Sequence, residues 1–316
     1  MNILYLINHF IFSSFFTLFA AEVGIALILL FSYKNYDKLR TYLMPMWEIN
    51  GTFAILYIVS FEAIYPQLLP TIVDLYLIPV MLAALLFILR NAFLSYSENV
   101  GASKKKLYVK IYSIITILIS FIIISIFSSA LSGIKINLSG QVNNIIPMLF
   151  NNFNILMFFS VALISFYSMC IVLSINYSKK VALITLILSI FIGAYAILTY
   201  TSYLTTILFS GVFLALICLT LIGFIITLIS FIYQRNTLKK LMLPTFFLLI
   251  FTISIAQYPF IFGNKMQINQ YLTSGVNTIP IIYITIIGMF FVSISIGYLI
   301  YIHNKPIKHK KSQNIY

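Results

Sequence analysis

The sequence has few charged side chains. Only 8% of its 316 residues are Asp, Glu, Lys or Arg, whereas 62% are hydrophobic, and the mean hydropathy is +1.06. A soluble domain carries about 25% charged residues, and no soluble core could bury this much apolar surface. Many of the apolar runs reach the roughly 20 residues that cross a bilayer. The sequence therefore excludes an ordinary soluble fold and predicts an all-α integral membrane protein.

Cysteine and histidine are also scarce. The two cysteines, Cys170 and Cys218, both lie within apolar runs, so no disulfide framework and no thiolate metal cluster can be built from them. Of the three histidines, only His9 lies within a predicted span. Haem in a membrane bundle usually takes an axial His, Met, Cys or Tyr from a spanning helix. We therefore expect no metal site, and no haem, on this chain.

The apolar runs predict about nine transmembrane helices. We place them at residues 8–32, 46–65, 71–95, 107–130, 149–176, 181–201, 204–233, 240–262 and 279–302. The net charge of +13 does not indicate nucleic-acid binding, because the basic residues lie in the short loops between these runs. Such charges orient a membrane protein instead.

The basic residues alternate between the two sides of the predicted membrane domain. Those that border the loops after the odd-numbered spans are Lys34, Lys38, Arg40, Arg90, Lys104, Lys105, Lys106, Lys110, Lys179, Lys180, Arg235, Lys239, Lys240, Lys305, Lys308, Lys310 and Lys311. The other loops hold only Lys135 and Lys265. Because positive residues stay in the cytoplasm, we predict an outside N-terminus, a membrane domain over 1–304 and a basic cytoplasmic tail over 305–316.

The acidic residues are confined to the first third of the chain. They are Glu22, Asp37, Glu48, Glu62, Asp74 and Glu98. Asp37 and Glu98 lie in loops beside lysines, and Glu62 and Asp74 lie near the outer ends of spans, where water can reach them. Glu22 lies well inside the first span, about 15 Å from its cytoplasmic end at the helical rise. A charged side chain at that depth costs about 2.5–3.5 kcal/mol on insertion scales.

Glu22 and Glu48 together predict the start of a proton path. Glu48 lies about one turn inside the cytoplasmic end of the predicted second span, and Asn50 and Thr52 follow it. One carboxyl at the inner mouth and another deeper in the membrane would carry protons up from the cytoplasm, and acids within a membrane are functional by default. In the alternative, both are neutral carboxyls that bond a neighbouring backbone carbonyl.

Two short stretches resemble a known family. "PMWEINGTF" resembles the Trp-Asp-Gly-Asn-Gln-Val-Trp signature at the second span of cytochrome bd-type quinol oxidase subunit II, with Trp47, Glu48 and Asn50 on its Trp, acid and Asn. "AAEVGIAL" is similar to the Asp-x-Gly element of that family's first span, with Glu22 and Gly24 on the matching positions. The order and spacing of the two elements agree with the family.

A third stretch extends the resemblance to about the first hundred residues. "LRNAFLSY" is similar to the family's Arg and the Tyr six residues later, which here are Arg90 and Tyr96. The chain also departs from the pattern, because Ile49 replaces the Gly after the acid and Phe53 replaces the second Trp. The sequence is thus identified as a divergent member of the family.

The resemblance implies a subunit of a terminal oxidase that oxidises quinol and reduces oxygen to water. It implies two four-helix bundles, here about 1–130 and 149–262, plus an extra helix at about 279–302. It implies a heterodimer with the haem-bearing subunit I, which holds haems b and d and the quinol site, while the acid after the Trp lines a cytoplasmic proton path. Quinol, oxygen and lipid are the expected small partners. The Ile, Asn, Lys and Tyr bias indicates an AT-rich prokaryotic genome, and we predict a multi-pass protein of the prokaryotic cell membrane.

Two other functions fit the residues. The first is a proton-coupled secondary transporter that uses Glu22, although such folds tend to show inverted repeats and broken helices, which the sequence does not show clearly. The second is a purely structural partner in another respiratory complex. Replacing both carboxyls would then affect assembly and not rate.

Overall fold

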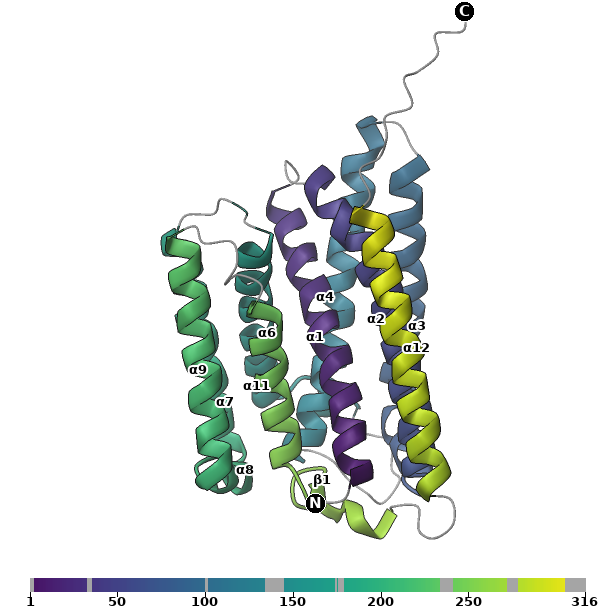
Figure 1. The fold of residues 1–316 in the computed structure, drawn as a ribbon, viewed down its shortest axis with the longest axis vertical. Coiled ribbons are helices and arrows are strands. Elements are labelled where there is room, and N and C mark those ends of the chain that lie inside the picture. The colour runs from purple at the N-terminus through teal and green to yellow at the C-terminus, as the bar shows by residue number, and fades with distance from the viewer. Residues whose placement is uncertain are drawn as a thin grey trace, which may run out of the picture.

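The fold is a bundle of long helices that run roughly side by side (Figure 1). The computed structural model describes residues 3–32, 36–99, 102–133, 145–173, 175, 179–233, 241–271 and 278–304. The predicted tail at 305–316 lies outside the described residues. The long helices are α1 (Ile3–Phe31), α2 (Tyr36–Ile64), α3 (Leu69–Asn99), α4 (Ala102–Ser132), α6 (Asn152–Val172), α7 (Lys179–Tyr200), α9 (Gly211–Ile232), α11 (Met242–Ala256) and α12 (Thr278–Asn304).

Short elements fill the connections. They are the helices α5 (Ile145–Leu149) and α8 (Ser202–Leu208), the 3₁₀ helix η2 (Ile268–Tyr271), and strands β1 (Phe260–Ile261) and β2 (Met266–Gln267). The strands pair antiparallel, with Phe260 opposite Gln267. The start of α6 is fixed by its own sequence, because Asn151 Oδ1 accepts a hydrogen bond from the Asn154 backbone nitrogen at 2.9 Å, as an N-cap does.

The described helices make this a multi-pass membrane protein. Six of them, namely α1, α3, α4, α6, α7 and α9, are long and apolar enough to cross a bilayer. The other predicted spans overlap α2, which carries charged residues, and α11 and the apolar part of α12, which are shorter. The prediction of nine spans and the predicted orientation therefore remain predictions.

Several predicted boundaries differ from the structure. The helix α2 begins at Tyr36, ten residues before the predicted second span, because a helix can continue beyond the bilayer into charged sequence. The predicted span 204–233 is divided into the short helix α8 and the longer α9. The predicted span 240–262 ends early, since α11 stops at Ala256 and the β1–β2 turn follows.

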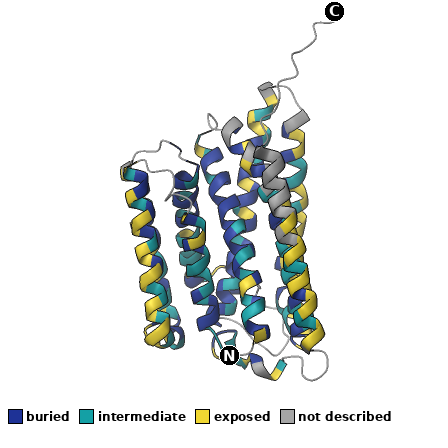
Figure 2. Ribbon diagram, viewed as in Figure 1, coloured by how far each residue is buried: buried dark blue, intermediate teal, exposed yellow. Residues whose placement is uncertain are grey.

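The helix α1 is the centre of the molecule. It packs against α2, α4, α6 and α11, whereas α3 packs on α4, α7 on α6, α9 on α11 and α12 on α2. Figure 2 shows α1 as mostly buried and α9 as largely exposed. We call α1–α4 the first helix group and α6, α7, α9 and α11 the second helix group. The predicted division into two bundles and an extra helix stays a prediction.

Gly24 is needed where α1 approaches α6 closely. A Cβ atom at Gly24 would overlap the Ser165 backbone oxygen and would lie 2.6 Å from Met169 Cγ. Small residues permit such close approach between membrane helices. The family position on which Gly24 falls is thus a packing position in this chain.

Candidate functional site

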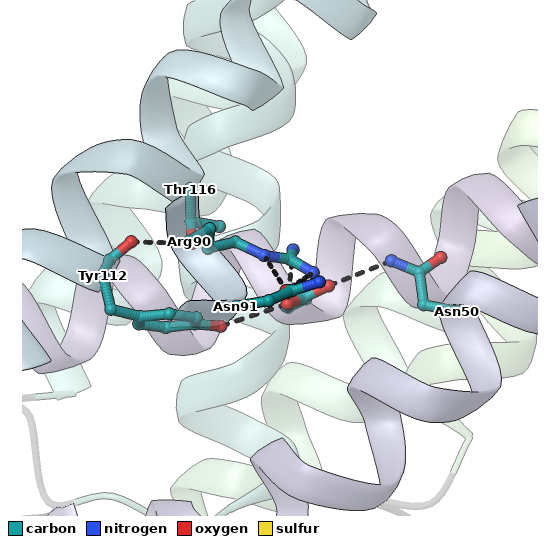
Figure 3. Close-up of polar contacts among 6 residues, drawn as sticks. Asn50, Arg90, Asn91, Tyr112 and Thr116 are labelled. Carbon is teal, nitrogen blue, oxygen red and sulfur yellow. Dashed lines mark hydrogen bonds and ion pairs between the residues drawn. The ribbon is translucent and has the colours of Figure 1, made fainter. Parts of the chain in front are cut away.

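The candidate site is built around Glu22, which is 0% exposed in the middle of the first helix group. Its carboxylate lies 2.6 Å from Arg90 Nη1, and that contact joins Oε1 to α3. Tyr112 on α4 donates its hydroxyl to the same oxygen at 3.1 Å. Asn50 on α2 donates its Nδ2 to Oε2 at 3.0 Å. Each helix of the first group therefore supplies one side chain to this centre (Figure 3).

Arg90 is held independently of Glu22. It is 0% exposed, and its Nε and Nη2 atoms donate to Asn91 Oδ1 at 3.2 and 3.1 Å. Its guanidinium carbon also lies 4.1 Å from the centre of the Phe87 ring, which is a cation–π contact. The Nη1 contact with Glu22 is short, but its N–H groups are not aligned along it, so it is an ion pair and not a hydrogen bond.

The described contacts of Glu22 are all with side chains. Arg90, Asn50 and Tyr112 all present donors or positive charge to its oxygens. No backbone carbonyl is among the described partners of Glu22, and the alternative of a neutral carboxyl stays a prediction. Removing one partner of such a buried pair typically costs about 3–5 kcal/mol, because a buried charge is left uncompensated.

Glu48 and Thr52 do not join this centre. Both are exposed on α2, where Thr52 Oγ1 donates to the Glu48 backbone oxygen at 3.0 Å. Among the described residues, no hydrogen bond or ion pair joins Glu48 to Glu22. The reason is helical geometry, because Glu48 and Asn50 are two residues apart and so point about 200° apart around the helix axis.

Glu48 lies at about the level of Glu22 along the bundle, and its predicted place at the inner mouth stays a prediction. Since α2 begins at Tyr36, Glu48 is about three turns from the start of that helix. Asn50 contacts Glu22, and two residues rise only about 3 Å along a helix. Glu48 and Glu22 therefore lie at nearly the same depth, on opposite sides of α2.

The remaining signature residues have separate environments. Trp47 is half-buried on α2. Tyr96 is 56% exposed, and its ring centre lies 6.2 Å from that of Tyr108. Among the described residues, no group of three or more His, Cys, Asp or Glu side chains could hold a metal ion. His9 packs its ring 4.0 Å from the Tyr5 ring.

Tyr112 and Asn91 are site residues that the sequence did not single out. Tyr112 is one of 22 tyrosines, and nothing in its stretch, "KIYSIIT", indicates a contact with Glu22. Its place follows from the packing of α4 on α1. Asn91 directly follows Arg90, and that adjacency was the one available signal.

Comparisons with known proteins identify the fold and the family of this chain. The bd oxidase from Geobacillus thermodenitrificans contains a chain with the same fold, with a TM-score of 0.73 over 95% of this chain and 98% of that chain, at 15% sequence identity. A search of curated proteins finds no match. The sequence profile of the family described as "Cytochrome bd terminal oxidase subunit II" matches residues 1–303. The chain therefore belongs to the cytochrome bd terminal oxidase subunit II family.

Proposed function

We propose that this chain is the non-haem integral subunit of a cytochrome bd-type terminal oxidase and that its Glu22 centre lies on a proton path. The partner would be the haem-bearing subunit I, with haems b and d and the quinol site. The complex would lie in a prokaryotic cell membrane, oxidise quinol and reduce oxygen to water. The observation that carries the proton role is the carboxylate of Glu22, fully buried and held by side chains from three neighbouring helices.

A buried ion pair of this kind is costly to keep for stability alone. Replacing such a pair with apolar residues of similar volume is often neutral or stabilising, so its presence in an apolar bundle calls for another reason. A carboxyl can accept and release a proton without any covalent change elsewhere. Reduction of oxygen to water consumes protons, so an oxidase needs such groups on the route from the cytoplasm.

The exposed face of α2 supports a protein partner. Glu48, Thr52, Ile55, Val59 and Glu62 are exposed at spacings of four, three, four and three residues, which is the pattern of a helix–helix seam. A carboxylate that faced lipid at the depth of Glu48 would cost about 2.5–3.5 kcal/mol. We infer that the haem subunit covers this face. Glu48 would then lie at the boundary between the two subunits, where it could pass protons to the haem subunit.

The other outward face fits lipid. The exposed residues of α7 and α9 include large apolar side chains such as Ile187, Phe191 and Ile222. The sequence has no acidic residue after Glu98, so this face carries no carboxylate. Lipid is the partner that such a surface suits. Family membership makes the proton-coupled transporter the weaker alternative, and proton-driven uptake by the chain alone in liposomes would favour it.

The proposal is tested by purifying the chain from its native membrane in mild detergent. We expect a stoichiometric second integral protein, haem bands in a reduced-minus-oxidised spectrum, and quinol-driven oxygen uptake. A haem-free chain that purifies alone and active in transport would contradict the proposal. A variant with Ile55→Asn, purified in parallel, reports whether the α2 face carries the partner.

A further inference from the structure

The outward face of α4 changes character along the helix. Its exposed residues are Lys104, Lys106, Leu107, Lys110, Ile114 and Leu118. The last four recur at intervals of three or four residues, which places them along one side of the helix. The exposed lysines lie only in the first turns of α4, and the exposed residues beyond them, Ile114 and Leu118, are large and apolar. This face therefore passes from basic to apolar along the helix.

The exposed lysines of this face have no described counter-charge. Lys105 is engaged, because its Nζ lies 4.7 Å from the centre of the Tyr36 ring. In contrast, Lys104, Lys106 and Lys110 make no hydrogen bond or ion pair with the described residues. Positive charge near a helix N-terminus is unfavourable, as is a pair of like charges four residues apart, such as Lys106 and Lys110. An anion beside these lysines would relieve both penalties.

The lysines lie where α4 leaves the hydrocarbon part of a bilayer. The helix has 31 residues, which is about 46 Å at the helical rise, whereas about 20 residues cross the hydrocarbon core. Lys110 is the last charged residue of α4, so the excess length is at the lysine end. Figure 1 shows the ends of α3 and α4 projecting beyond the end of α1. The lysines thus reach the level of the lipid headgroups, and Ile114 and Leu118 lie at the level of the acyl chains.

We propose that the outward face of α4 binds an anionic phospholipid. Its phosphate accepts hydrogen bonds from Lys106 and Lys110, and its acyl chains lie along Ile114 and Leu118. Basic residues beside a membrane attract anionic lipid in this way. A free inorganic phosphate would meet the lysines alone and leave the apolar part of the face without a partner, so the face fits a lipid better. The inference does not depend on the proton role of Glu22.

The first test is photo-cross-linking of the intact oxidase. The oxidase is placed in nanodiscs of phosphatidylcholine that contain a photoactivatable phosphatidylglycerol, and the labelled peptides are identified by mass spectrometry. One lysine near an anionic membrane surface contributes about fivefold to binding. We therefore expect the double variant with Lys106→Gln and Lys110→Gln to lower the labelling of α4 about 10-fold or more. This variant should fold, because it removes two like charges from the start of a helix.

Two control variants separate the effect of charge from other effects of substitution. The double variant with Lys106→Arg and Lys110→Arg keeps both charges and both phosphate donors, so it should keep the labelling of α4. Lys180→Gln removes an exposed lysine at the start of α7, in the second helix group, and should also leave the labelling of α4 unchanged. Each variant should keep the haem content and the rate of oxygen reduction of the parent, which shows that the assembly is intact.

The second test uses the parent oxidase without any substitution. Salt screens exposed charges, so the labelling of α4 by phosphatidylglycerol should fall as the salt concentration rises, and labelling by a photoactivatable phosphatidylcholine should not. Unlabelled phosphatidylglycerol should compete with the probe, and inorganic phosphate should not. Equal labelling of the parent and the Gln double variant would overturn the proposal, as would equal labelling of α4 by the two lipids. Competition by inorganic phosphate would indicate a site for a free anion and would also overturn it.

Discussion

The two helix groups share an arrangement but differ in their interiors. In the first group α1 packs on α2 and α3 on α4, and in the second α6 packs on α7 and α9 on α11. The first group encloses the Glu22–Arg90 ion pair. Within the second group, Tyr167 donates to the Phe224 backbone oxygen at 3.4 Å, a weaker neutral contact.

The outward faces of the two groups also differ in whether they carry acidic side chains. Glu48 is exposed on α2, whereas no helix of the second group contains an acidic residue. The same pairwise packing of helices therefore occurs in a group that carries carboxylates and in a group that carries none. Carboxylates inside and outside the first group fit a proton route and a protein partner, and an apolar second group fits a scaffold that faces lipid.

The largest expected effect on the difference between the two helix groups comes from Arg90→Leu. This change leaves the buried carboxylate of Glu22 without its cation, which typically costs about 3–5 kcal/mol. We expect most of the assembled oxidase to be lost, as measured by haem content after mild purification and by thermal unfolding. The double variant with Glu22→Leu should recover assembly without recovering oxygen reduction. In the second group, Tyr167→Phe should cost about 1 kcal/mol or less.

A smaller effect is expected at the outward faces. Ile55 on α2 is 65% exposed and Ile225 on α9 is 54% exposed. If α2 carries the haem subunit, Ile55→Asn should weaken the complex by about 2 kcal/mol or more, as at an interface hot spot. The amount of haem subunit that stays bound to the chain after detergent washing measures this loss. Ile225→Asn is the matched change on the other face, and equal loss from both variants would refute the assignment of the α2 face.

The smallest expected effect compares two glycines. Gly24→Ala would force α1 and α6 apart, because the added Cβ would overlap the Ser165 backbone, and overpacking of this kind typically costs about 1–3 kcal/mol. Gly51→Ala meets no atom of this chain within 4 Å and should not destabilise it. Thermal unfolding of the purified chain distinguishes the two. A loss of complex but not of chain stability in Gly51→Ala would show that the partner packs there.

The sequence predicted the helical class and singled out Glu22, which the structure buries, because apolar runs and a carboxylate within one of them are local features. The resemblance to the family added Arg90, and the structure joins it to Glu22. The inward placement of Asn50 and the outward placement of Glu48 required the packing of α2. Helical periodicity shows that these two residues oppose each other, but only the neighbouring helices determine which one faces inward.

Tyr112 and the start of α2 could not be predicted for related reasons. A tyrosine in an apolar run is equally suited to packing, to an interface with water or to a hydrogen bond, so its role depends on which helix lies opposite. Hydropathy marks where a helix enters the bilayer and not where it begins. The early start of α2 was therefore not predicted, since α2 continues from Tyr36 through the charged sequence before the predicted span.

The most direct test of the proton role is the rate of quinol-driven oxygen consumption per haem in the intact oxidase with Glu22→Gln. Glutamine keeps the size of the side chain and an oxygen that can accept from Arg90 and Tyr112, but it cannot carry the proton. We predict a loss of about 10²-fold, the scale of a missing proton-transfer group, with an unchanged haem spectrum and a near-parent rate for Glu62→Gln. A Glu22→Gln oxidase that turns over at the parent rate would contradict the account.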